Sequence, residues 1–310
     1  MILNDVQLTG FVLCPIAMVG AIINWTVVYV INKLPSFKHS FGYLSANQAI
    51  GDAIHSTTFL FYFCPMVISD SELLKTYSRH CGFLLLLGYE LSVHTHFVIS
   101  FNRFFAAYAP YKYKSFFSDQ NTKYIVAFIW VITLSTSITY YEILCNLYYA
   151  EETGFFYFTV SPTCNFIGWY LDFIKNLTII IIIVILDICT VVRVRLVNNR
   201  VRSSLDAEAT HRFSNREMNF LKQTVIQGCI FTLELFTYFV LPPYLHGKWS
   251  IFFSTSFAWV AVHAVDGVVT MTFNPEFRRY IFSCGLVTSR SDTFHTTASH
   301  VHASTHSGTK

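Results

Sequence analysis

The stretch "LTIIIIIVIL", residues 177–186, decides the fold class of this chain. It contains one hydroxyl side chain and no charge, and its apolar character continues on both sides over residues 168–192. A helix needs about 20 mostly apolar residues to cross the hydrocarbon core of a bilayer. The segment must be helical there, because no water is available to satisfy its backbone groups. Residues 168–192 are therefore predicted to form a transmembrane helix.

Six other stretches of the chain have similar length and apolar character. The composition agrees, since 53% of the residues are hydrophobic and only 13% are charged, whereas a soluble domain has about 25% charged residues. We predict an all-α integral membrane protein, a seven-transmembrane helix bundle within residues 1–285. Its spans are residues 9–32, 41–68, 82–107, 123–144, 168–192, 219–245 and 250–273.

The distribution of Lys and Arg predicts the orientation of the spans. If the N-terminus is extracellular, 17 of the 21 Lys and Arg residues fall on the cytoplasmic side, as the positive-inside rule requires. The other four are Lys75, Arg79, Lys175 and Lys248. The C-terminus is then cytoplasmic, with a short amphipathic helix at about 275–284 and a disordered tail at 286–310 that is rich in Ser, Thr and His.

Composition also limits the partners and cofactors. A net charge of only +3 gives no polyanion-binding signature, so we expect membrane lipid but no nucleic acid as a partner. Eight cysteines without a CxxC spacing indicate no zinc site. We expect no metal and no cofactor. The histidines of the tail are better explained as part of a solvated segment.

Ionisable groups at membrane depth are costly and usually functional or paired. In the predicted outer half, three pairs have helical spacing and so share a helix face. They can line a ligand cavity that opens to the outside, or they can only bond to one another between helices. These residues are Glu90 with His94, Glu234 with Tyr238, and His263 with Asp266.

Three further polar residues are predicted to lie deeper, on three different helices. Asn24, Asp52 and Asn274 fall at similar depth, nearer the middle or the inner half of their spans. They predict either a water or cation cluster or a set of buried structural hydrogen bonds. Asp187, near the inner end of its span, is expected to reach water.

Other classes of membrane protein fit the sequence less well. There is no HExxH and no GxSxG motif, so we expect no enzyme. A multi-pass transporter or ion-coupled carrier remains the alternative, because buried carboxylates also mark ion pathways. Internal repeats are typical of transporters, and none is visible here.

Four stretches carry a family resemblance, and they are spread over residues 9–285. They are "FGYLSANQAIGDAIHSTTFLFYFCPM" (41–66), "HFVISFNRFFAAYAPYKY" (96–113), "FIGWYLDFIKN" (166–176) and "FNPEFRR" (273–279). Together they resemble a G-protein-coupled receptor, and in detail the nematode serpentine chemoreceptors of class X (Srx). The resemblance implies a chemosensory receptor of the plasma membrane, located in the sensory cilia of chemosensory neurons. Its partners would be an external small-molecule or peptide ligand and a cytoplasmic heterotrimeric G protein.

The resemblance also implies roles for residues near the cytoplasmic side. Asn102, Arg103 and Phe104 stand at the G-protein coupling motif, with a neutral Asn102 where many receptors have an aspartate. We therefore expect Arg103 to be loosely restrained and the receptor to signal without ligand. Asn274 and Pro275 would end the last span as part of the polar core.

Cysteine roles follow from the same resemblance. A receptor disulfide is expected between Cys81 and Cys164, with Cys145–Cys164 as the rival pairing. Cys284 would lie at the inner membrane surface, where it would be palmitoylated or remain a free thiol.

Overall fold

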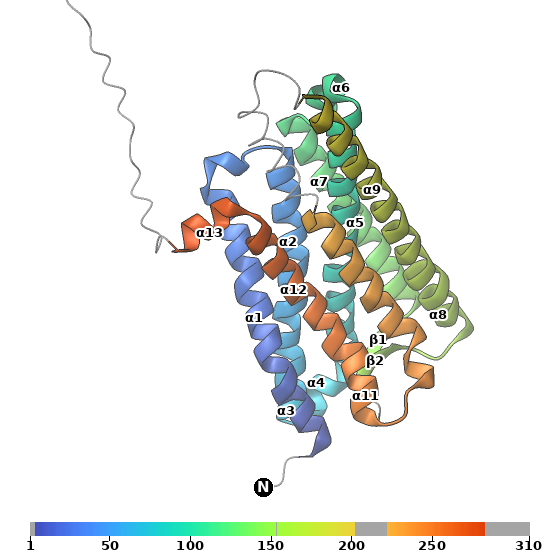
Figure 1. Cartoon of the computed structure of the whole chain (residues 1–310). Helices are drawn as coiled ribbons and strands as arrows, with labels where there is room; N and C mark the ends of the chain where they lie inside the picture. The colour runs from blue at the N-terminus through green and yellow to red at the C-terminus, as the bar shows by residue number, and fades with distance from the viewer. Residues whose placement is uncertain (1–3, 153, 202–221, 283–310) are drawn as a thin grey trace, which may run out of the picture.

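The computed structural model describes residues 4–152, 154–201 and 222–282. Its long helices run side by side in a bundle (Figure 1). The main helices are α1 (Asp5–Lys33), α2 (Ser40–Thr58), α5 (Ser78–Tyr108), α7 (Asp119–Ile138), α9 (Lys175–Val201), the segment Lys222–Val240 and α12 (Ala258–Phe273). Short helices connect or extend them: α3 (Cys64–Ile68), α4 (Glu72–Thr76), α6 (Pro110–Phe116), α8 (Pro162–Phe166), α11 (Lys248–Phe252) and α13 (Pro275–Phe282). The predicted all-α membrane bundle is confirmed.

Within the described residues, six helical stretches are long and apolar enough to cross a membrane. The remaining helix of the bundle, α2 with its continuation to residue 68, is not among them. It buries several polar side chains, among them Asn47, Gln48, Asp52 and His55, which make it less apolar than its neighbours. Its polar face points into the bundle, so the protein interior supplies the hydrogen bonds that lipid cannot.

Two glycines allow α2 and α5 to cross closely. A Cβ atom at Gly51 would lie 2.8 Å from the carbonyl oxygen of Gly88, and a Cβ at Gly88 would lie 2.8 Å from that of Gly51. Any side chain at either position would collide with the other backbone. Small residues at such crossings let membrane helices pack by van der Waals contact, since lipid offers no hydrophobic force to join them.

The loop after α7 contains a β-hairpin that the sequence did not predict. Strand β1 (Leu147–Ala150) pairs antiparallel with β2 (Phe155–Phe158). The hairpin lies at the end of the bundle that holds the start of α1 and the helix α11 (Figure 1). The Tyr238 hydroxyl donates a hydrogen bond of 2.8 Å to the carbonyl of Phe156. This bond connects the hairpin to the helical segment Lys222–Val240, the sixth long helix of the bundle.

The predicted Cys81–Cys164 disulfide is wrong. Cys164 is bonded to Cys145, with a Cα–Cα distance of 5.3 Å. Cys81 is a free, fully buried thiol of α5. The hairpin explains the pairing, because β1 and β2 fold back and bring the start and end of this loop together.

A lysine joins two loops at the same end of the molecule. Lys75 of α4 lies 2.6 Å from Asp70 and 2.9 Å from Glu151 of the hairpin turn. Desolvation disfavours the charged lysine, but the hydrogen bonds to Asp70, Glu151 and Glu72 outweigh it and raise the pKa of Lys75. The charge cluster holds the α3–α4 connection against the hairpin.

Candidate functional site

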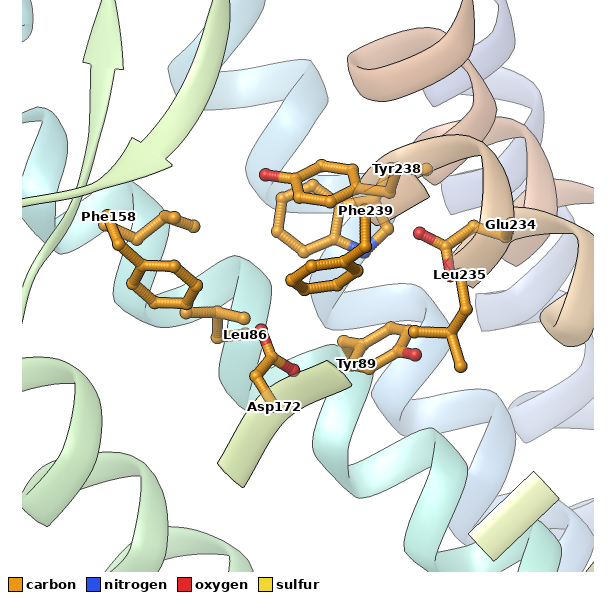
Figure 2. Close-up of a pocket in the computed structure, with 10 residues that line it drawn as sticks. Leu86, Tyr89, Phe158, Asp172, Glu234, Leu235, Tyr238 and Phe239 are labelled. Atoms are coloured by element: carbon orange, nitrogen blue, oxygen red, sulfur yellow. The ribbon is translucent and has the colours of Figure 1, made fainter. Parts of the chain in front are cut away.

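A narrow pocket lies under the hairpin. Figure 2 shows its side chains converging from α5, the start of the fifth long helix, the sixth long helix and the hairpin. Acidic and aromatic side chains dominate its lining. The lining residues are Leu86, Tyr89, Leu147, Phe158, Asp172, Glu234, Leu235, Tyr238, Phe239 and Trp259.

Local helix geometry places two of the polar groups in the pocket. Asp172 lies in the π-helical stretch Ile167–Ile174, and Tyr238 lies in the π-helical turn Phe236–Val240. Single-turn π-bulges re-aim side chains and are frequent at functional sites. Glu234 precedes the second turn and is only 3% exposed. The structure thus brings Glu234 and Tyr238 together as the sequence predicted, and it adds Asp172.

Glu90 does not line this pocket, because it is engaged by other residues. Its carboxylate oxygens lie 2.5 and 2.6 Å from the Lys175 ammonium nitrogen. Tyr141 donates to it at 3.1 Å, Asn176 at 3.3 Å, and the His94 ring nitrogen lies 3.6 Å away. Lys175, which was counted on the extracellular side, begins α9 and neutralises a carboxylate that is 1% exposed.

His263 and Asp266 also lie away from the pocket, contrary to the prediction that they line it. The His263 imidazole is 2.6 Å from a carboxylate oxygen of Asp52, and Asp266 accepts a hydrogen bond of 3.0 Å from Gln48. Asn24 donates to the backbone carbonyl of His263 at 2.9 Å. These residues form a polar core between α1, α2 and α12, in which Asn24 and Asp52 were predicted and His263 and Asp266 were not.

Asn274 is absent from this polar core. It caps the end of α12, and its side-chain oxygen accepts a hydrogen bond from the backbone of Glu276 at 3.2 Å. Pro275 begins α13. Eight residues separate Asn274 from Asp266, about 12 Å along a helix, so the expected depth of Asn274 was wrong and Asp266 takes its place beside Asp52.

Arg103 lies at the other end of α5, near α6. It is 7% exposed, and its guanidinium carbon lies 3.8 Å from the centre of the Phe41 ring. Its neighbour Asn102 donates a hydrogen bond of 3.2 Å to Ser40, while Phe104 stacks on Tyr108 at 4.5 Å between ring centres.

Asp187 of α9 faces Arg103 rather than water. It is fully buried and interacts electrostatically with Arg103. The expectation that Asp187 reaches water was wrong. A carboxylate from another helix thus stands near the arginine whose own neighbour is neutral, which argues against a loosely restrained Arg103.

Sequence reasoning missed Asp172 and Trp259 as pocket residues and Asp187 as the acid near Arg103. A signal for the first was present: Asp172 and Asn176 are four residues apart in an otherwise apolar span, and they share a hydrogen bond of 2.9 Å. The predicted lipidation site Cys284 lies outside the described residues.

Comparison with known proteins fits this geometry. The family model described as "Serpentine type 7TM GPCR chemoreceptor Srx" matches residues 14–274. The Caenorhabditis elegans protein "Serpentine receptor class X 45" is 30% identical over 281 residues, which cover 84% of this chain and 77% of the relative. "Serpentine receptor class X-43" from the same organism is 28% identical and covers 90% of this chain and 88% of the relative.

The fold itself is similar to that of a known receptor structure. The crystal structure of squid rhodopsin superposes with a TM-score of 0.72 at 16% identity, covering 91% of this chain and 86% of that chain. At this identity the likeness concerns the fold alone. The family match over most of the chain settles the membership, and this protein therefore belongs to the Srx family of serpentine seven-transmembrane chemoreceptors.

Proposed function

We propose that this multi-pass membrane protein acts at the plasma membrane of chemosensory neurons, in their sensory cilia. It binds an external small molecule in the pocket under the hairpin and activates a heterotrimeric G protein through the end of the bundle that carries Arg103. Family membership supports the chemoreceptor role.

The observation that carries the proposal is that one helix joins the two ends. Tyr89 of α5 lines the pocket, and Arg103 lies fourteen residues later on the same helix, about 21 Å along its axis. Aromatic contacts extend the connection sideways, since the Tyr89 ring centre lies 6.3 Å from that of Trp259 and 5.9 Å from that of His263. A ligand that displaced Tyr89 or Trp259 would therefore shift α5 and, through the contact of Tyr89 with His263, the polar core.

A reconstituted signalling assay tests the proposal. Cells that express the chain are screened with small organic cues, and each active cue is then tested for guanine-nucleotide exchange on a purified G protein with the receptor in nanodiscs. Arg103→Ala should abolish exchange at normal surface level. Arg79→Ala, which removes an exposed arginine at the opposite end of the same helix, is the matched control and should signal normally.

The transporter alternative is tested in the same cells. Accumulation of a radiolabelled active cue inside cells, without nucleotide exchange and with no effect of Arg103→Ala, would show that the chain is a carrier. Exchange without accumulation supports the receptor.

A further inference from the structure

The pocket under the hairpin has an unbalanced charge. Two of its ten lining residues, Asp172 and Glu234, are acidic, and none of the ten is Lys, Arg or His. Lys175 and His94 both contact Glu90; Lys175 also acts electrostatically on Asp172, whereas no base is among the groups that act on Glu234. Asp172 and Glu234 also act on each other electrostatically. The described part of the chain therefore lines this space with two carboxyl groups and with no basic side chain.

Glu234 indicates where a positively charged group of a ligand would bind. Its side chain is almost completely buried, and one of its carboxylate oxygens has no hydrogen-bond partner. Figure 2 shows the carboxyl groups of Glu234 and Asp172 directed toward the space between them, with the rings of Tyr89 and Phe239 nearby. Burial of a carboxylate without a partner is costly, so a donor or cation in the pocket would be bound favourably.

The aromatic walls suit a cation with an organic body. The ring centre of Tyr238 lies 5.4 Å from that of Trp259 and 5.2 Å from that of Phe239. Tyrosine and tryptophan faces attract an ammonium group that approaches within about 6 Å. Tyr89 and Leu86 of α5 line the same narrow space.

We propose that the ligand of this pocket is a small organic ammonium compound, whose charged nitrogen is bound between Glu234 and Asp172 and whose apolar part packs on Tyr238 and Trp259. The proposal rests on the proposed receptor function and specifies its ligand class. Glu234 provides the main counter-charge, since Asp172 already accepts a hydrogen bond from Asn176.

The test measures binding by the full-length receptor in nanodiscs, through the ligand-dependent rise in its unfolding temperature. The probes are phenethylamine and choline, each compared with a neutral alcohol of the same shape, phenethyl alcohol and the carbon analogue of choline. At least one ammonium probe should stabilise the wild-type protein in a saturable way, while its neutral partner has no effect. Glu234→Gln should weaken the binding of that probe on the order of thirtyfold or more, since it breaks a buried charge pair.

Two further variants keep the outcome interpretable. Asp172→Asn should also weaken binding, and Glu152→Gln, a change at an exposed glutamate of the hairpin turn, should not. Equal stabilisation by an ammonium probe and its neutral partner, unchanged binding by Glu234→Gln, or no stabilisation by either ammonium probe would overturn the proposal. The assay contains no G protein, so a failure of coupling cannot imitate these results. Conversely, nucleotide exchange in response to a neutral or acidic cue would keep the receptor function and reject the ammonium ligand.

Discussion

Lys175→Met is expected to destabilise the bundle strongly because it leaves Glu90 buried without a counter-charge. The Lys175 ammonium lies 2.5 Å from one carboxylate oxygen of Glu90, and the exposed fractions of the two side chains are 28% and 1%. After the substitution, only the neutral donors Tyr141 and Asn176 and the His94 ring remain within reach of the carboxylate. A methionine of similar length keeps the packing of the side-chain stem.

The size of the effect follows from the geometry. Two unit charges 2.5 Å apart attract by about 7 kcal/mol at an effective dielectric constant of about 20, and the cost of desolvating both groups offsets much of this. Breaking a buried pair from one side costs about 3–5 kcal/mol. Since Lys175 is partly exposed, we expect about 3 kcal/mol, which corresponds to a decrease in unfolding temperature of roughly 5–10 °C.

The assay is a double-mutant cycle on thermal unfolding of the receptor in nanodiscs. Glu90→Gln alone should cost about 1 kcal/mol, because the partly exposed Lys175 can turn toward water. The double variant should be close to Glu90→Gln, since the unpaired charge is gone in both. Lys112→Met, at an exposed lysine of α6, serves as the control. Additive effects of the two single changes, or a Lys175→Met protein as stable as the control, would refute the inferred ion pair.

Three other results are expected. Peptide mapping should find the disulfide between Cys145 and Cys164, and a Cys81–Cys164 peptide would disprove the pairing. Replacing both Cys145 and Cys164 by serine should lower the free energy of unfolding by about 3 kcal/mol for a loop of this length. Cys81→Ser should change it little. Arg103→Lys should lose most ligand-evoked nucleotide exchange at normal surface level, because a lysine cannot stack its charge on Phe41 as a planar guanidinium does; full exchange would make this arginine a membrane anchor. An epitope at the C-terminus should bind antibody only after cell permeabilisation, as the Lys and Arg distribution predicts, and labelling of intact cells would reverse the orientation.

The fold class and the family could be predicted from the amino-acid sequence alone. Length and apolar composition are local properties, so each long helix could be predicted from its own residues without any knowledge of its neighbours. Arg103 was likewise found by its position at the end of an apolar stretch, and Asn24 and Asp52 by their polarity within one. The end of the last span was predicted in the same way: α12 ends at Phe273 with Asn274 as its cap, and α13 begins at Pro275. Only the assignment of Asn274 to the polar core was wrong.

Which polar groups come into contact depends on how the helices pack against one another. Glu90 and Lys175 are 85 residues apart, and Asp52 and His263 are 211 apart. Their contacts depend on the rotation and depth of each helix in the bundle. In a soluble protein the apolar stripe of a helix reveals its rotation, but in a membrane both the lipid-facing and the buried faces are apolar, so that signal is weak. The same reason explains why Asp266 was assigned to the pocket and Asp172 was missed. The pairing of Cys164 with Cys145 depends on the hairpin. Its strands pair through backbone hydrogen bonds, which cannot be predicted from any single residue of the loop.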